Sequence, residues 1–303
     1  MPERYRFGYG PGSTYERVVG LLERLGPPTG VVVDLGCGYG AMAEPLGDRG
    51  YTYVGIDGDP GSVEALRARG VEAEVRALDE PSDLAPLLER LTRQRPLAAV
   101  CLLDVLEHLS VGEDLLDVLR RSAAAHPGAL LIMSVPNVAH LDLAAKLLLG
   151  RWDVTPTGLL DETHITLYTE SRLNEVVQRT GWVERDRDDL VLDHSDQHFP
   201  AGAATLRATS PLGALVRDAR GRLPASIVNQ FVRAYLPGTP STVPPPPERD
   251  RFLTVVVSVG GSHPGLLAEV LLSLAAQTSQ DFDVVVCCPD TAHQALVDAR
   301  AAI

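Results

Sequence analysis

The chain has 303 residues, of which 45% are hydrophobic and 22% charged, a composition that supports one large domain or one domain with part of another. Its formal net charge of −13 repels phosphate backbones and argues against nucleic acid as the main partner. The four cysteines fit neither a zinc-site nor a disulfide spacing, so we expect reduced thiols in a cytoplasmic protein. The first ten residues lack the apolar core of a secretory signal, and no apolar run is long enough to span a membrane.

Short β-rich runs alternate with amphipathic helical stretches over about the first 190 residues. The predicted strands are 31–35, 53–56, 72–76, 98–103 and 130–135, and the predicted helices are 41–49, 62–69, 83–93 and 113–125. This alternation predicts a Rossmann-like α/β fold, with a parallel sheet covered by helices on both faces. The runs 31–35 and 98–103 are almost wholly apolar, as buried central strands should be.

The next segment departs from this alternation. Residues 137–168 contain a helical pattern at 141–149 and a loop, which we interpret as an insertion that caps the carboxyl edge of the sheet, where ligands bind in open α/β folds. The polar stretch 193–198 holds ligand-capable side chains without helical or hairpin spacing and is interpreted as a solvated loop. The other predicted elements are a helix at 170–179, a strand from 182 to about 192, a helix at 211–221 and a last strand at 227–235.

A proline-rich segment divides the chain. Four consecutive prolines, Pro244–Pro247, favour an extended linker, so we place the first domain at 1–236, the linker at 237–251 and a second unit at 252–303. The second unit starts again with a strand at 253–259, a glycine turn, a helix at 266–277 and a strand at 284–288.

The run Val31–Gly40 reads as a buried strand that enters a turn with glycines at 36, 38 and 40. Glycine is required where the backbone is left-handed or where a ligand approaches the main chain closely. Asp57 ends the next strand, where a carboxylate can accept both ribose hydroxyls of a nucleoside. Asp34 precedes the first glycine and suits the ammonium group of an amino-acid ligand, directly or through water. A generic Rossmann turn is the alternative.

These residues closely resemble the first two motifs of class I S-adenosylmethionine methyltransferases, in Asp34-Leu-Gly-Cys-Gly-Tyr-Gly40 and Gly55-Ile-Asp57. Ala77-Leu-Asp79 is similar to the family's loop beside the adenine, and Cys101–Leu109 to the fourth motif of the branch that contains ubiquinone-biosynthesis O-methyltransferases. The resemblance covers about residues 1–236. It implies a seven-stranded sheet with an antiparallel last strand and S-adenosyl-L-methionine as the cofactor. The cofactor-binding residues that it implies are Asp34, Gly36, Cys37, Gly38, Asp57, Gly58, Leu78, Asp79, Leu103 and Asp104.

Further features point to the acceptor side. The block from Pro136 to Tyr168 looks like the one found in bacterial methyltransferases fused to glycosyltransferases. Transfer to a hydroxyl requires removal of a proton, and His108 and His164, with Glu107 as partner, are the candidate catalytic residues. Either histidine could instead be a hydrogen-bonded surface or capping residue. Three tyrosines before the first strand either line the cofactor's amino-acid end or simply pack the N-terminal arm; they are Tyr5, Tyr9 and Tyr15.

A metal site is a second interpretation of the same residues. Asp104, Glu107 and His108 lie at i, i+3 and i+4, so a helical turn would place them on one face. With His164 they could hold Mg²⁺, Mn²⁺, Fe²⁺ or Zn²⁺, and the spacing resembles that of metal-dependent 2′-O-methyltransferases of small-RNA 3′ ends. The acidic chain argues against RNA as the acceptor, and a Glu–His pair also occurs in metal-free relatives. We therefore prefer catalysis by histidine without metal.

Residues 252–303 resemble the opening of a family 2 glycosyltransferase and would form a partial, glycosyltransferase A-like α/β unit. The remainder of such a domain and its Asp-x-Asp motif are lacking, so the segment is either truncated or a retained remnant. The leading hypothesis is an O-methyltransferase acting on a sugar hydroxyl of a glycan or glycosylated natural product. The alternatives are an N- or C-methyltransferase of a small metabolite, or a catalytically idle cofactor-binding module that positions a glycosyltransferase. A homodimer is left open.

Overall fold

The computed structural model describes residues 8–199, 207, 209–240, 253–258, 274 and 282–287. The chain divides into two compact units, Met1–Thr242 and Val243–Ile303. Tyr5, the predicted linker beyond residue 240 and most of the segment 252–303 lie outside the described residues.

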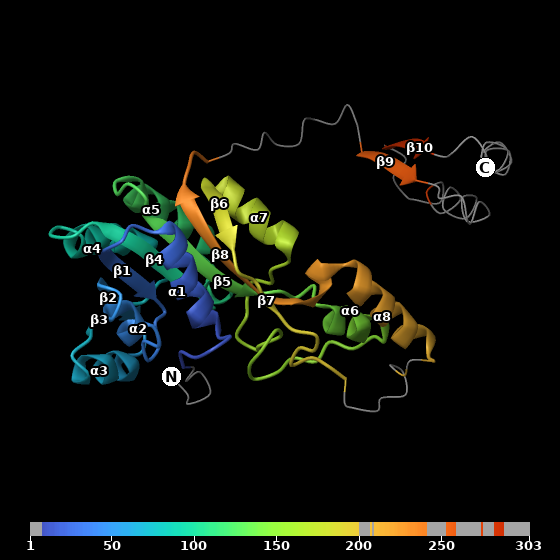
Figure 1. The fold of residues 1–303 in the computed structure, drawn as a ribbon, viewed down its shortest axis with the longest axis horizontal. Coiled ribbons are helices and arrows are strands. Elements are labelled where there is room, and N and C mark those ends of the chain that lie inside the picture. Colours follow the sequence, from blue (N-terminus) through green and yellow to red (C-terminus); the bar gives the residue numbers. More distant parts are fainter. Residues whose placement is uncertain are drawn as a thin grey trace, which may run out of the picture. The chain divides into compact units, whose positions relative to one another are not determined.

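The first unit is built on one mixed sheet (Figure 1). Its strands are β1 (Gly30–Leu35), β2 (Tyr51–Asp57), β3 (Glu72–Val75), β4 (Leu97–Leu103), β5 (Leu130–Pro136), β6 (Trp182–Arg187), β7 (Leu190–Val191) and β8 (Val228–Pro237). Their order is β3-β2-β1-β4-β5-β8-β6, and β7 also pairs with β8. Strands β1 to β5 run parallel, whereas β8 is antiparallel to β5, β6 and β7. The predicted Rossmann-like fold with an antiparallel last strand is confirmed.

The predicted strand from 182 to about 192 is two strands, β6 and β7. Between them the carboxylate of Asp189 accepts the backbone N–H of Val232 at 2.9 Å, in the place of a backbone carbonyl. Aspartate is depleted in strands because its short polar side chain competes for such bonds. The ladder is therefore interrupted at this point.

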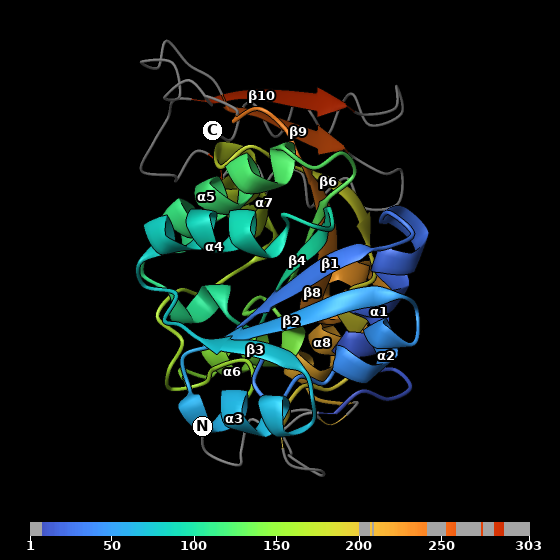
Figure 2. The ribbon, with the colours of Figure 1, turned by 90° about the vertical axis from the view of Figure 1, so that its left-hand side faces the viewer.

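Helices cover both faces of the sheet (Figure 2). They are α1 (Thr14–Leu25), α2 (Ala43–Gly47), α3 (Pro60–Ala68), α4 (Leu84–Leu91), α5 (Gly112–Ala124), α6 (Leu141–Leu148), α7 (Glu170–Arg179) and α8 (Pro211–Arg222). Helices α4, α5 and α7 share one core with Val31 and Val33 of β1, and α1 and α2 share the other core with Val32. Successive side chains of a strand point to opposite faces, which is why the run Val31–Val33 of β1 is apolar at every position.

Helix α1 occupies the segment that the sequence left as an N-terminal arm. The Ser13 hydroxyl accepts the backbone N–H of Glu16 at 3.2 Å and caps the helix. Its buried face is formed by Val18, Val19, Leu21 and Leu22. This helix places Tyr15 and Thr14 beside the sheet.

The insertion 137–168 leaves and rejoins the sheet at one point. Asn137 and Tyr168 form an isolated β-bridge, and the Asn137 amide donates to the Val228 carbonyl at 2.8 Å. Helix α6 of this insertion packs against α8 (Figure 1). Within the described part of the chain, no helix is long and apolar enough to cross a membrane.

In the second unit, β9 (Leu253–Ser258) and β10 (Phe282–Cys287) pair in parallel. They coincide broadly with the predicted strands at 253–259 and 284–288. Apart from Leu274, the predicted helix at 266–277 lies outside the described residues. The glycosyltransferase A-like assignment therefore stays a prediction.

Candidate active site

A glycine turn follows β1 and is fixed by its neighbours. Gly36 and Gly38 have φ values of 74° and 51°, in the left-handed region where a Cβ is unfavourable. The N–H groups of Gly36 and Cys37 both donate to the Ile56 carbonyl, at 2.7 and 3.1 Å. A Cβ built on Gly36 would lie 2.4 Å from Val105 Cγ2. The turn thus requires glycine both for its backbone conformation and for its packing.

Asp57, at the end of β2, holds this turn to the start of α3. One carboxylate oxygen accepts the Gly38 N–H at 2.7 Å and the other accepts the Asp59 N–H at 2.8 Å. Asp59 in turn caps α3 by accepting the Ser62 N–H at 3.0 Å. Each oxygen of a carboxylate has a further lone pair, so Asp57 can still accept a pair of ribose hydroxyls.

A cavity of about 690 Å³ opens above the turn. It is lined by Tyr15, Gly36, Cys37, Gly38, Tyr39, Ala41, Asp57, Gly58, Asp59, Pro60, Ala77, Leu78, Leu103, Asp104, Val105, His108, Leu109 and Thr163. All of the predicted cofactor-binding residues are among them except Asp34 and Asp79. Sequence reasoning missed Thr163, although its position directly before His164 could have indicated it. The apolar residues Ala41, Pro60 and Leu109 carry no local signal that would have marked them.

Asp34 and Asp79 occupy different surroundings. Asp79 is exposed. Asp34 is buried beneath the turn, where one of its carboxylate oxygens accepts the Tyr53 hydroxyl at 2.7 Å. Burial raises the pKa of Asp34 to about 7, and the nearby Asp57 adds to the rise while the Tyr53 hydrogen bond opposes it. Asp34 therefore changes its charge near neutral pH.

Asp104 is the one non-glycine residue with positive φ in the described part of the chain, at 54°. Its backbone N–H donates to the Ser134 carbonyl at 3.0 Å. Its carboxylate accepts the Ser134 hydroxyl at 3.0 Å and the amide of Gln230. The short helical turn begins only at Leu106. Asp104 consequently lies outside this turn, and of the predicted four-residue metal set it is the residue that does not belong to the group of mutually close ligand atoms.

The other three residues of that set come together. One ligand atom from each of Glu107, His108 and His164 lies within 4.8 Å of the others. His164 Nε2 is 3.9 Å from Glu107 Oε1, and the two imidazole centroids are 4.8 Å apart. The loop of His164 is held because the Ile165 and Thr166 N–H groups both donate to the Glu107 carbonyl, at 2.9 and 3.0 Å. We call these three residues the acceptor cluster.

Burial controls the charges of the acceptor cluster. Glu107 is 1% exposed, and neither of its carboxylate oxygens has a hydrogen-bond partner among the described residues. Burial raises the pKa of Glu107 well above its ordinary value, and Asp104 adds to the rise. Burial also lowers the pKa of His164, with a further contribution from His108. An unsatisfied buried carboxyl is costly, so a ligand that supplies a hydrogen bond or a positive charge to Glu107 would relieve this cost.

His108 is the member of the acceptor cluster that lines the cavity. Its Nδ1 lies 3.2 Å from the Thr163 carbonyl and 3.1 Å from the Thr163 hydroxyl. A carbonyl oxygen only accepts, so Nδ1 carries the proton in the Thr163 carbonyl bond. His108 Nε2 is then the lone-pair nitrogen, able to take a proton from a molecule in the cavity.

A family model described as a methyltransferase domain matches residues 12–184. The chain belongs to this family. The match includes the glycine turn, Asp57 and the acceptor cluster. Residues 12–184 therefore form a methyltransferase domain, and we expect its S-adenosylmethionine cofactor to bind in the cavity.

Several known methyltransferases are similar to this chain. A ubiquinone biosynthesis O-methyltransferase of Azorhizobium caulinodans is 32% identical over 110 residues, which cover 35% of this chain but only 40% of that protein. The crystal structure of magnesium protoporphyrin IX methyltransferase from Synechocystis is 14% identical, with a TM-score of 0.44 over 74% of this chain and 83% of that chain. A 1,6-didemethyltoxoflavin-N1-methyltransferase of Burkholderia thailandensis is also 14% identical, with a TM-score of 0.45 over 76% and 80%.

The residues of the cavity fit the cofactor. Gly36 and Gly38 have no side chain that would keep the cofactor away from the main chain. The free lone pairs of Asp57 match the two ribose hydroxyls. Leu78 and Leu103 offer apolar surface to an adenine ring. The cavity volume is also of the size of small-molecule sites.

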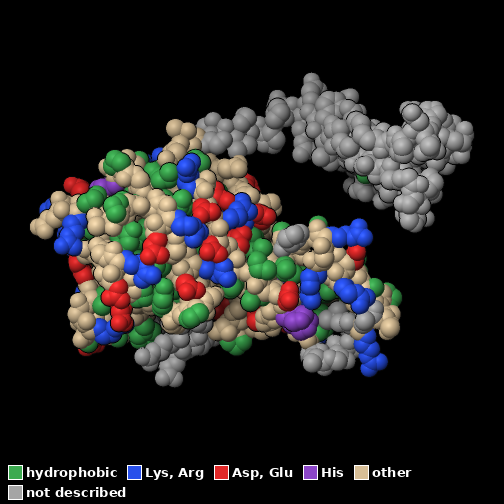
Figure 3. Space-filling view, in the orientation of Figure 1, with side chains coloured by type: hydrophobic (Ala, Val, Ile, Leu, Met, Phe, Trp, Pro, Cys, Tyr) green, Lys and Arg blue, Asp and Glu red, His purple; other side chains and the backbone are tan. Residues whose placement is uncertain are grey.

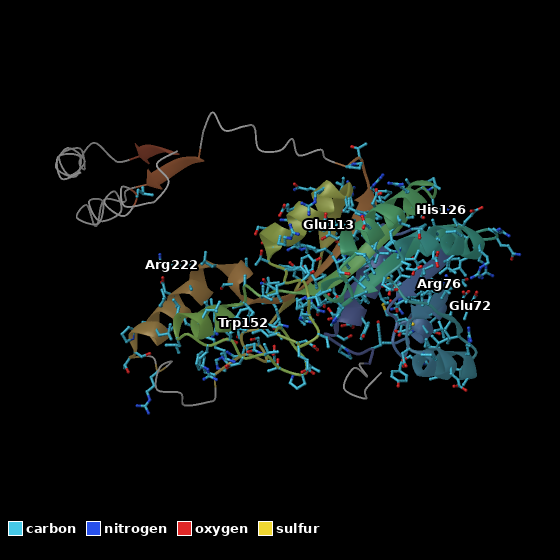
Figure 4. The ribbon with its side chains drawn as sticks, turned by 180° about the vertical axis from the view of Figure 1, so that it is seen from behind. Glu72, Arg76, Glu113, His126, Trp152 and Arg222 are labelled. Carbon is cyan, nitrogen blue, oxygen red and sulfur yellow. The ribbon has the colours of Figure 1, made fainter. Side chains whose placement is uncertain are left out.

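We predict that Asp57→Ala weakens the binding of S-adenosylhomocysteine at least tenfold. Hydrogen bonds to a charged group contribute about 1.5–3 kcal/mol, and the variant also loses the contacts that order the turn. Titration calorimetry measures the affinity. Glu72→Ala is the matched control, because Glu72 is an exposed acid on the neighbouring strand β3, away from the cavity (Figure 4). Unchanged affinity in Asp57→Ala would show that the ribose lies elsewhere.

We predict that the same affinity rises with pH through neutrality. The pKa of Asp34 is raised to about 7, so the carboxyl is neutral below that pH and cannot attract the ammonium group of the cofactor. Between about pH 6 and about pH 8 the ionised fraction of such a group rises about tenfold, and the affinity should follow. Asp34→Asn should flatten the profile. A parent affinity that stays level or falls over this range contradicts the assignment.

Proposed function

We propose that this methyltransferase acts on a hydroxyl group, with a sugar of a glycan or glycosylated natural product as the acceptor. The acceptor cluster is the observation that favours a hydroxyl as the acceptor, because a hydroxyl must lose its proton to attack and an amine need not. The O-methyltransferase relative of Azorhizobium caulinodans supports it at low identity. The sugar rests on the glycosyltransferase-like character of residues 252–303.

When bound, S-adenosylmethionine supplies a methyl group on a positively charged sulfur. The glycine turn and Asp57 would hold the cofactor and fix its orientation. His108 Nε2 accepts the proton of the acceptor hydroxyl, while Thr163 holds Nδ1 and so fixes the ring. His164 and Glu107 do not line the cavity. One ligand atom of each lies within 4.8 Å of one on His108, so Glu107 and His164 act through His108 by positioning its imidazole.

A divalent cation is the second candidate for acceptor activation. It is favoured by Glu107, whose carboxylate is buried beside two imidazoles and has no hydrogen-bond partner among the described residues. Glu107, His108 and His164 would hold such an ion, a set of one oxygen and two nitrogen ligands. The ion would supply Lewis acidity that lowers the pKa of an acceptor oxygen.

We predict that His108→Ala reduces turnover by about 10²–10⁴-fold, the usual contribution of a general base, while the affinity for S-adenosylhomocysteine stays near that of the parent. His126→Ala, an imidazole outside the cavity, is the control. The EDTA test is made with His194→Gln, which lacks one ligand of the other candidate metal group (Asp142, His194 and His198), so that only an ion at the acceptor cluster can respond. If His108 acts as a base, the activity of this variant survives EDTA. Loss of its activity with EDTA and recovery with a divalent ion would establish the metal instead. Full turnover in both His108→Ala and His164→Ala would refute hydroxyl activation by this cluster.

We predict methyl transfer to a sugar hydroxyl when labelled cofactor is offered with a panel of free and glycosidic sugars, phenols and amines. Phenols and amines are the matched alternatives, because an amine needs no base and a phenol loses its proton easily. Labelling of amines alone would move the protein to the N-methyltransferases. Binding of S-adenosylhomocysteine without transfer to any acceptor would identify an idle module.

A further inference from the structure

The segment 193–198 folds back onto the first turn of α6. The Ser195 N–H and hydroxyl both donate to one carboxylate oxygen of Asp142, at 2.8 and 3.1 Å. Ser195, Gln197 and Asp142 are all buried. The interpretation of this segment as a solvated loop is therefore wrong, because its alternate side chains point into the protein.

Two histidines of this segment meet at the same carboxylate. His198 Nδ1 lies 3.0 Å from the other oxygen of Asp142, and the rings of His194 and His198 stack with centroids 3.8 Å apart. One ligand atom from each of Asp142, His194 and His198 lies within 4.8 Å of the others. His194 is exposed and His198 is partly exposed. Figure 3 shows histidine surface beside α6 and α8, so an ion can reach the group from solvent.

Two cationic side chains lie near these residues. The Arg220 guanidinium is beside His194, with Nη2 3.4 Å from His194 Nδ1. Lys146 is engaged by Asp153 and Gln197. An ion bound at His194 Nδ1 must therefore displace Arg220.

A neighbouring histidine, His140, is occupied. Its Nε2 lies 3.0 Å from the Leu192 carbonyl, to which it donates, and its Nδ1 accepts the Asp142 N–H at 3.2 Å. His140 thus has no free nitrogen and serves to position Asp142. A carboxylate offers about four lone-pair sites, of which Asp142 uses three, so this residue retains capacity for an ion.

We propose that Asp142, His194 and His198 bind a divalent transition-metal ion of the Zn²⁺ class. Two imidazole nitrogens and one carboxylate oxygen suit Zn²⁺, Co²⁺ or Ni²⁺, whereas Mg²⁺ and Ca²⁺ select oxygen ligands. The site shares no residue with the acceptor cluster. Its ligands come from α6 and from the segment that precedes α8, so the ion joins two parts of the chain about 50 residues apart in sequence.

The bound ion stabilises the region around the acceptor cluster. Asp196 accepts the Leu159 N–H at 3.2 Å, and the Gln197 amide donates to the Thr155 hydroxyl at 3.2 Å. The segment 193–198 is thus attached to the loop that leads to His164. Fixing this segment on α6 fixes that loop, and we assign the ion a structural role.

The proposal is tested on the tag-free full-length chain, stripped with EDTA and titrated with Co²⁺, whose visible absorption reports coordination. We expect His194→Gln and His198→Gln each to lower the affinity for Co²⁺ at least tenfold. A tenfold loss is the lower end of what a change around a metal's ligands usually causes. His194 is exposed, so its replacement does not disturb the core. Zn²⁺ should also raise the thermal midpoint of the parent and not that of His194→Gln.

Two controls separate this site from others. His126→Gln should bind Co²⁺ as the parent does. Figure 4 shows His126 at the opposite end of the unit from Trp152, which follows α6 in the sequence. His108→Gln and His164→Gln should keep the Co²⁺ site that His194→Gln loses, whether or not hydroxyl activation at the acceptor cluster is correct. The proposal is overturned if the parent binds neither Co²⁺ nor Zn²⁺, or if His194→Gln and His198→Gln bind Co²⁺ with the parent's affinity.

Discussion

The buried guanidinium of Arg233 determines where the last strand can lie. Arg233 is in β8, 1% exposed, and pairs with Glu170, Glu184 and Asp189 at 2.7, 3.3 and 3.0 Å. Burial acts to lower the pKa of Arg233, but the carboxylates of Asp189 and Glu170 hold it above its ordinary value. Removing a partner from a buried pair costs about 3–5 kcal/mol, so β8 is stable only where α7, β6 and the turn after β6 converge. That place is between β5 and β6.

This position of β8 carries Gln230 to the edge of the sheet where the cavity opens. The Gln230 amide donates to the Asp104 carboxylate, and its oxygen accepts the Thr14 hydroxyl at 2.6 Å. The side-chain contacts of Asp104 with Gln230 and Ser134 offset the free-energy cost of its left-handed backbone. The floor of the cofactor cavity therefore depends on the sheet order as well as on the glycine turn.

Local features of the chain were predictable from sequence. The runs that form β1, β4 and β5 are largely apolar because both faces of these strands are covered. The glycine turn with Asp57 follows from chain geometry within one βαβ unit. Features that depend on distant partners were not. Asp104 leaves the expected helical turn because Gln230, 126 residues away, binds it. The segment 193–198 was predicted to be solvated because its partner, Asp142, lies in α6, about 50 residues earlier in the sequence. Glu107, His108 and His164 could be grouped from sequence because a family motif names two of them and a histidine of the insertion completes the set; their ligand atoms lie within 4.8 Å of one another, while their role in catalysis stays a prediction.

The two carboxylate–histidine groups differ in how far the protein satisfies them, and this difference assigns their roles. Asp142 accepts three hydrogen bonds from Ser195 and His198, so its geometry is fixed before any ligand arrives. Glu107 accepts none and is buried. Satisfied polar groups rigidify a fold, whereas an orphaned carboxyl stores free energy that a bound partner releases. A site that must admit and release an acceptor needs the second kind, and a site that only holds two segments together needs the first. The free-energy cost at Glu107 thus lies next to the cofactor cavity, where binding and catalysis can use it.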